Sequence, residues 1–116
     1  TLAVRGAPVI NDATRADALA AGLEDIVNII DNGSDAPGTI LNDCSAEFRR
    51  HFDEADMIIA KGQGNFESLS DEPCNIFFLF RIKCPVISRH SGFSVGTYVA
   101  ANRFQHRDIP AERGVQ

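Results

Sequence analysis

Residues 55–65, Ala-Asp-Met-Ile-Ile-Ala-Lys-Gly-Gln-Gly-Asn, place a short apolar run directly before a polar turn that contains two glycines. The apolar run at residues 57–60 predicts a buried strand, and residues 61–65 end it. A helix beyond the turn is indicated by Phe66, Ser68 and Leu69. Ligands of open α/β sheets bind outside the carboxyl ends of the strands, so we expect a binding site at this junction.

The chemistry of the turn suits an anion. Gly62 and Gly64 remove side chains, so backbone N–H groups can approach a phosphate closely, and a helix starting near Asn65 adds its positive end. Lys61 supplies a full positive charge. The turn is not a P-loop, and it lacks the third glycine of the dinucleotide-binding fingerprint. The alternative is that the glycines only turn the chain and that Lys61 is a solvated residue at a strand end.

Composition limits the class of protein. The 116 residues suit a single domain, and the 44% hydrophobic and 23% charged fractions are those of an ordinary globular protein. A net charge of -5 disfavours nonspecific nucleic-acid binding, which needs a basic surface. No apolar run is long enough to cross a bilayer. We therefore expect neither a nucleic acid nor a membrane as partner.

The three cysteines, Cys44, Cys74 and Cys84, are an odd number and lack the spacing of a zinc site. This pattern argues against a disulfide framework and for a reducing, cytoplasmic setting. We expect the thiols to be inert.

The first half of the chain alternates strand and helix patterns. Residues 2–4 form a strand candidate, and Thr14 with Asp17 has the spacing of a capping box at a helix start. The β-branched run at residues 26–30 predicts a strand buried on both faces. The loop at residues 31–38 follows this strand, so it is a second candidate for the edge of the site; the alternative is a solvated turn.

The second half continues the alternation. We expect a helix over residues 42–55 with Phe48 and Phe52 on its buried side, and a central strand over residues 76–82 covered on both faces. Further expected segments are a short strand at 86–90, an edge strand at 99–101 and a loosely ordered tail at 102–116. The order of these elements predicts an α/β protein with a three-layer α/β/α Rossmann-like arrangement and a mostly parallel sheet, occupying residues 1–101.

Three separated segments resemble one known family. They are residues 6–14, Gly-Ala-Pro-Val-Ile-Asn-Asp-Ala-Thr; residues 55–67, which include Lys-Gly-Gln-Gly-Asn-Phe-Glu; and residues 83–90, Lys-Cys-Pro-Val-Ile-Ser-Arg-His. In this order they resemble the damage-control phosphatases, once named domain of unknown function 89 and also labelled after an acidic-residue methyltransferase. The resemblance covers about residues 4–99.

The resemblance implies a metal-dependent phosphatase acting on small phosphorylated metabolites, such as sugar phosphates or phosphopantetheine derivatives. A role in methyl transfer to protein carboxylates has also been proposed for one branch of the family. The family binds one divalent metal, here Mn, Co, Ni or Mg, through an adjacent Asp-Asn pair and a further aspartate. Asp12 matches that aspartate, as catalytic residue and metal ligand. Lys61 matches a catalytic and substrate-binding lysine, and the substrate phosphate would also contact Gly62, Gly64 and Asn65.

The Asp-Asn pair of the family belongs upstream of residue 6, where the chain does not contain it. Asp31-Asn32-Gly33 looks similar but follows a different strand, so no ligand role is carried over to it. The resemblance therefore implies that the chain is the C-terminal part of a phosphatase, inactive alone and completed by an N-terminal part of the same protein.

Two functions remain open. The first is the phosphatase, with Asp12 and Lys61 converging on one crevice, where a cation and an oxyanion share them. The second is a non-catalytic Rossmann-like module that holds a phosphorylated ligand. For Asp12 the local alternative is a helix N-cap. Arg89 and His90 are expected to have structural roles.

Overall fold

The computed structural model describes residues 1–102 and divides the chain into two compact units, Thr1–Ala55 and a second unit from Asp56 onward. Each unit is described by itself. Between residues 1 and 102, no helix combines the length and the apolar character needed to cross a membrane. The predicted tail at 103–116 lies outside the described residues, whereas Asn102 does not belong to a tail because it ends the last strand.

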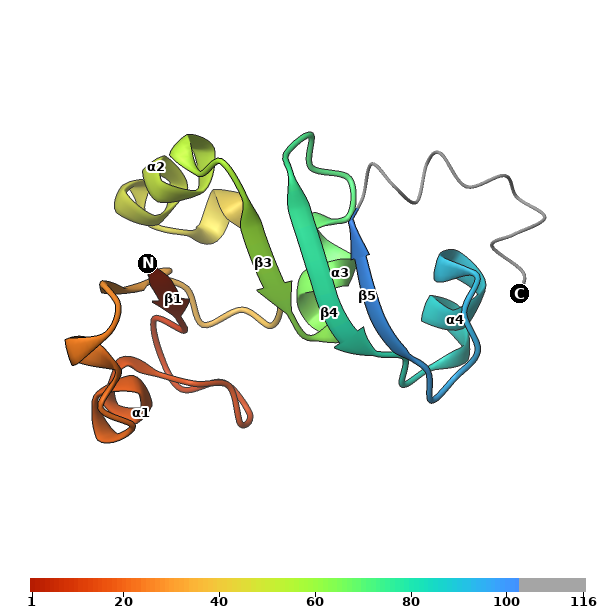
Figure 1. Ribbon diagram of the computed structural model, residues 1–116, viewed down its shortest axis with the longest axis horizontal. Helices are drawn as coiled ribbons and strands as arrows, with labels where there is room; N and C mark the ends of the chain where they lie inside the picture. Colours follow the sequence, from red (N-terminus) through yellow and green to blue (C-terminus); the bar gives the residue numbers. More distant parts are fainter. Residues whose placement is uncertain (103–116) are drawn as a thin grey trace. The chain divides into compact units, whose positions relative to one another are not determined.

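The first unit is built on a two-stranded parallel sheet. Leu2 of the first strand lies opposite Ile29 of the second. Helices follow each strand, as Figure 1 shows. The elements are β1 (Leu2–Val4), α1 (Arg15–Ala20), the 3-10 turn η1 (Leu23–Asp25), β2 (Ile29–Asp31), the 3-10 turn η2 (Leu41–Asp43) and α2 (Ala46–Glu54).

The start of α1 confirms the predicted capping box. The backbone N–H and the hydroxyl of Thr14 both donate to Asp17 Oδ2, at 2.8 and 2.9 Å. These two hydrogen bonds stabilise the charged carboxylate, the bond from the backbone N–H more than that from the hydroxyl, so the pKa of Asp17 is lowered. The helix ends before Gly22, whose φ of +73° lies in the left-handed region that glycine tolerates.

The helix α2 also forms as predicted, although it begins at Ala46 and the preceding residues make a 3-10 turn. Ser45 caps it, with its side chain accepting the Phe48 N–H at 3.1 Å. Phe48 and Phe52 are buried, and their ring centroids lie 6.1 Å apart. This aromatic pair confirms the buried side of the helix.

The predicted strand at residues 26–30 is wrong over most of its length. Ile26 closes the 3-10 turn by donating its N–H to the Leu23 carbonyl at 3.0 Å, and its side chain is 76% exposed. Only Ile29–Asp31 pairs with β1, and Ile30 alone is buried. The run of β-branched residues is therefore split between a turn and a strand, which composition cannot reveal.

The turns that follow β1 and β2 pack directly against each other. The Gly6 N–H donates to the Ser34 carbonyl and to Asn32 Oδ1, each at 3.0 Å. Asn32 is buried, and the same oxygen accepts the Ser34 N–H at 3.0 Å. A Cβ added to Gly6 would lie 2.6 Å from the Ser34 nitrogen and 2.8 Å from the Gly33 Cα.

Replacing Gly6 with alanine is therefore expected to destabilise the first unit by about 2 kcal/mol, because backbone atoms at these distances cannot yield as a side chain would. Urea unfolding measures the change. Gly22→Ala is the control, since its added Cβ meets nothing within 4 Å and only the left-handed φ opposes it. The control should cost about 1 kcal/mol. Equal losses in the two variants would contradict the proposed steric clash.

The second unit contains a three-stranded mixed sheet of order β3-β4-β5. In Figure 1, β3 and β4 run side by side in the same direction, and β5 returns antiparallel along the other side of β4. Its elements are β3 (Ile58–Lys61), α3 (Gln63–Leu69), β4 (Ile76–Arg81), α4 (Pro85–Ser91) and β5 (Tyr98–Asn102). The strand at residues 57–60, the helix after it, the central strand and the edge strand are thus confirmed to within a few residues.

One face of this sheet forms the core of the unit. Alternate residues of β4 are buried, among them Phe78 and Phe80. Phe66 of α3 packs on both, with ring centroids 5.3 and 4.5 Å away. The His90 ring of α4 lies 5.9 Å from Phe66, so its contact is one of packing, as expected.

Two predictions for the second unit are wrong. The central strand is not covered on both faces, because Ile59 and Leu79 on the other face are 59% and 38% exposed. The predicted strand at 86–90 is part of α4, which Pro85 opens at its first turn, where a proline needs no hydrogen-bond acceptor. Residues 1–102 thus form a mixed α/β structure with one parallel and one mixed sheet.

Candidate functional site

The predicted phosphate turn lies at the carboxyl end of β3. Lys61 is the last residue of the strand, and its side chain is exposed. Gly62 follows with a φ of +96°, a conformation that a residue with a side chain rarely adopts. Asn65 turns back on the strand end, where its Nδ2 donates to the Lys61 carbonyl at 2.7 Å.

The backbone N–H groups of this turn were expected to face an anion, but that of Gly62 faces the neighbouring strand. The Gly62 N–H donates to the Leu79 carbonyl at 2.9 Å and so extends the sheet. It is therefore not available to an anion. Gln63 and Gly64 occupy the first turn of α3, where N–H groups have no acceptor within the helix. The turn can thus offer an anion the Lys61 ammonium and these first-turn amides.

Gln63 is a residue of this site that the sequence analysis missed. Its Oε1 accepts the Lys83 N–H at 2.8 Å, and its Nε2 lies 3.9 Å from Cys84 Sγ. Lys83 and Cys84 connect β4 to α4. Gln63 therefore ties together the turns that follow two adjacent parallel strands.

Asp12 lies in the first unit, in the loop between β1 and α1. The loop is tight: Ile10 has a φ of +50°, and the Asp12 N–H donates to the Val9 carbonyl at 2.9 Å. Asp12 does not cap α1, because Thr14 occupies that position. Its side chain is 41% exposed and forms an ion pair, with Arg5 Nη2 lying 2.9 Å from Asp12 Oδ2.

Arg5 is the second residue that the sequence analysis missed. Its side chain is only 9% exposed. Nη1 donates to the Ala36 carbonyl at 2.7 Å and to the Gly38 carbonyl, while Nη2 binds Asp12. The guanidinium thereby holds the Asp12 carboxylate and the loop after β2 in one arrangement.

The carboxylate, histidine and cysteine side chains of the described residues are not clustered. Across residues 1–102, no group of three or more His, Cys, Asp or Glu side chains is placed to hold a metal ion. Asp12 has one oxygen on a guanidinium, so it has a single oxygen left to give to a metal. Mg²⁺ and similar ions need about six ligands, so further donors are required.

Asp12 and Lys61 belong to different units. The expectation that they converge on one crevice stays a prediction. Within each unit, the residue occupies the loop that follows a parallel strand, which is where ligands of α/β sheets bind.

The loop at residues 31–38 serves the fold. Asn32 is buried with its oxygen on two backbone amides, and Asp31 Oδ1 accepts the Gly33 N–H at 2.9 Å. These hydrogen bonds give the polar side chains of Asp31 and Asn32 a structural role in the loop.

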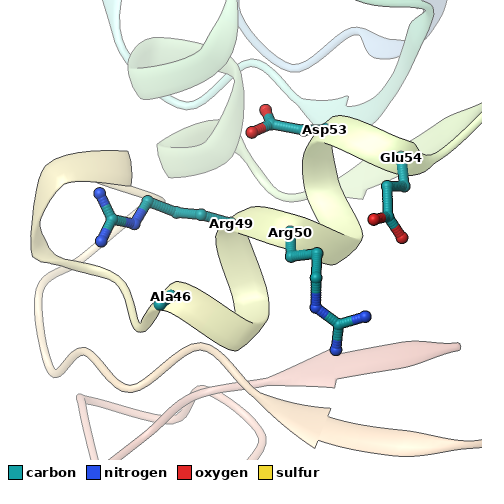
Figure 2. Close-up of a pocket in the computed structure, with 5 residues that line it drawn as sticks. All are labelled: Ala46, Arg49, Arg50, Asp53 and Glu54. Atoms are coloured by element: carbon teal, nitrogen blue, oxygen red, sulfur yellow. The ribbon is translucent and has the colours of Figure 1, made fainter.

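A shallow surface depression lies along α2, outside both predicted site regions. Figure 2 shows its lining side chains, which spread in different directions from a single helix instead of converging: Ala46, Arg49, Arg50, Asp53 and Glu54. Side chains four residues apart with opposite charges are ordinary on a helix surface. Because these side chains do not converge on one point, the depression does not present an assembled site.

Cys44, Cys74 and Cys84 are not joined by disulfides. Cys44 is buried, and burial, followed by the nearby Asp43 carboxylate, raises the pKa of its thiol. A raised pKa keeps the sulfur protonated and unreactive near neutral pH. For Cys44 this agrees with the predicted inert role.

Known proteins resemble the chain closely. The sequence model of one protein family, described as the damage-control phosphatase ARMT1-like domain, matches residues 1–99. A damage-control phosphatase from Pyrococcus horikoshii is 43% identical over 90% of this chain and 37% of its own length. A protein named as uncharacterized from Methanocaldococcus jannaschii is 42% identical over 86% of this chain and 34% of its own. A crystal structure of a DUF89 family protein from Pyrococcus horikoshii superposes with a TM-score of 0.84, at 43% identity over 87% of this chain and 36% of that one.

The chain therefore belongs to the family of damage-control phosphatases with an ARMT1-like domain. This membership confirms the family inferred from the three motifs. The chain spans about a third of the length of the relatives that it matches. The expectation that this third is specifically the C-terminal one is withdrawn, because the matches do not support it.

Proposed function

We propose that the full-length protein is a metal-dependent phosphatase that acts on small phosphorylated metabolites. Family membership gives the class of enzyme. The observation that supports a phosphate ligand is the turn after β3. There an exposed lysine precedes a glycine with a φ of +96°, and the first-turn amides of Gln63 and Gly64 have no acceptor within the helix. A three-layer arrangement, with the exposed face of the second sheet covered in the full-length protein, is part of the same proposal.

On the substrate side, Lys61 would neutralise charge on the phosphoryl oxygens. The amides of Gln63 and Gly64 would donate hydrogen bonds to the same oxygens. Donors that are already in place before the reaction can stabilise the charge that develops in the transition state, because they need not reorganise. Asn65 shapes this turn through its bond to the Lys61 carbonyl, and the proposal also places it beside the phosphate.

On the metal side, the proposal gives Asp12 one ligand oxygen for Mn²⁺, Co²⁺, Ni²⁺ or Mg²⁺. Arg5 would hold the other oxygen and so fix the direction of the carboxylate. A bound divalent cation would supply charge stabilisation for phosphoryl transfer. Because residues 1–102 contain no group of three His, Cys, Asp or Glu side chains around a metal position, Asp12 would need further ligands in the full-length protein.

The test is an assay of the full-length gene product on a panel of phosphorylated metabolites with each of the four metals. We expect metal-stimulated release of phosphate, and a loss of about 100-fold or more in Asp12→Ala. Asp12→Asn, which keeps the shape but not the charge, should also lose most of the activity. Thermal unfolding of both variants separates loss of a ligand from loss of fold.

Two results would contradict the proposal. Wild-type protein without metal-stimulated phosphate release, yet with measurable binding of a phosphorylated metabolite, would favour the non-catalytic binding module. Full activity in a folded Asp12→Ala variant would remove Asp12 from the metal site.

A further inference from the structure

We infer that Gln63 is a positioning residue, which holds the Lys61–Gly62 turn in the conformation that receives a phosphate. The inference rests on the proposed function and assigns a role to a side chain that need not touch the substrate. Gln63 is the first residue of α3 and half-buried. Its side chain is directed not to its own helix but to the turn after the neighbouring strand.

The register of the sheet explains why such a link is needed. Lys61 pairs with Leu79, and the Gly62 N–H closes the last ladder bond to the Leu79 carbonyl. Beyond that point β4 continues to Arg81, while the segment that follows β3 turns into α3. The two strand-end turns therefore have no backbone bond to each other. The Gln63 side chain spans this gap, with Oε1 accepting the Lys83 N–H at 2.8 Å.

Two further hydrogen bonds restrain the turn, from the Gly62 N–H to the Leu79 carbonyl and from Asn65 Nδ2 to the Lys61 carbonyl. Gly62 and Gly64 lose more conformational freedom on ordering than other residues do. Asn65 restrains the turn from within, through the Lys61 carbonyl, whereas Gln63 restrains it against a different strand. A turn restrained before binding spends less interaction free energy on ordering when the phosphate arrives. Loss of the Gln63 hydrogen bond should therefore weaken the binding of phosphate more than it lowers kcat.

The experiment uses the full-length protein and three variants. Gln63→Met keeps the length of the side chain and removes the acceptor. Gln63→Glu keeps an acceptor for the Lys83 N–H and adds a charge. Ser68→Ala is the matched control, because it removes neutral side-chain hydrogen bonding within the same helix, from Ser68 Oγ to the carbonyls of Gly64 at 2.9 Å and Asn65 at 3.4 Å.

Three measurements are made: amide hydrogen exchange at Lys83, inhibition by inorganic phosphate, and steady-state kinetics that give kcat and KM. In Gln63→Met we expect faster amide exchange at Lys83. KM and the inhibition constant of phosphate should each rise about fivefold, which is the size of effect that one hydrogen bond supports. The change in kcat should be less than about twofold. Ser68→Ala should leave all of these values within about twofold of wild type.

Gln63→Glu provides the rescue. We expect it to restore the protection of the Lys83 amide. Its KM should approach the wild-type KM measured at the same high salt concentration, because salt screens the added charge. Faster exchange at Lys83 in Gln63→Met with unchanged KM and phosphate inhibition would overturn the positioning role. Unchanged exchange would overturn the contact itself.

The same measurements keep this inference apart from the proposed function. If the wild-type protein binds inorganic phosphate but hydrolyses no substrate, the phosphatase proposal fails, and calorimetric titration with phosphate still tests Gln63. If the wild type is an active phosphatase and Gln63→Met behaves like Ser68→Ala, only the inference about Gln63 fails.

Discussion

Replacing Lys61 with methionine is expected to lower kcat/KM of the full-length protein by about 100-fold for a phosphorylated substrate. Removing one fixed donor from developing oxyanion charge typically costs a factor of about 10² to 10³. Lys61 supplies a full charge at a strand end where the Gly62 N–H is already committed to the sheet. The remaining amides of the turn cannot replace that charge.

The fold should tolerate the change. Lys61 is exposed, its side chain makes no ion pair within residues 1–102, and methionine keeps the apolar stem. Surface substitutions of this kind change stability by about 0.5 kcal/mol or less. Thermal unfolding therefore serves as the check that any loss of activity is local.

Lys61→Arg is the graded variant. Arginine preserves the charge but presents a planar fork in place of a compact ammonium, so we expect a loss of about tenfold. Steady-state kinetics with the best substrate of the panel measures both variants. Lys61→Met with more than half of the wild-type activity would remove Lys61 from the site and leave the glycine turn as a connection only.

The sequence predicted the region around Lys61 well because its signals are local. The apolar residues 57–60, the glycines and the following Phe66 all lie within ten positions, and each constrains its own stretch of backbone. The segment at 86–90 was misjudged because Val86 and Ile87 favour a strand, whereas Pro85 alone marks a helix start. In so short a segment, tertiary packing of Ile87 decides the outcome.

The parts of the site that sequence did not predict are contacts between distant residues. Gln63 reaches Lys83 across twenty positions, and Arg5 reaches Asp12 and then the carbonyls near residue 37. No periodicity or motif marks such contacts, since they depend on which strands become neighbours. The bond from the Gly62 N–H to the Leu79 carbonyl is a contact of the same kind, because its acceptor lies on β4.

Replacing Arg5 with methionine is expected to destabilise the first unit by about 3 kcal/mol. The side chain is 9% exposed and donates to two backbone carbonyls and to Asp12. Methionine fills a similar volume but leaves the Ala36 and Gly38 carbonyls without their donor. Breaking a buried charged contact by removing one partner typically costs about 3–5 kcal/mol. The half-exposed Asp12 carboxylate can turn to water, which places the expectation at the lower end.

Arg15→Met is the matched control. Arg15 also pairs with an aspartate, Asp31, but the separation is 3.4 Å and the side chains are 50% and 40% exposed. Exposed pairs of this kind contribute about 0–1 kcal/mol. Urea unfolding followed by circular dichroism should therefore separate the two variants by about 2 kcal/mol.

Burying Arg5 also costs free energy, which limits how much the side chain can stabilise the first unit. Its Nε is buried and meets no acceptor within residues 1–102. The desolvation of this N–H therefore cancels part of the stabilisation that the other hydrogen bonds of Arg5 provide. Arg5→Lys isolates the difference: one ammonium carries the charge without the buried Nε, but it cannot span Ala36, Gly38 and Asp12 as a planar fork does. We expect a loss between those of the two methionine variants. Equal stability of Arg5→Met and Arg15→Met would show that the loop after β2 is held without Arg5, and that Asp12 is free to reorient.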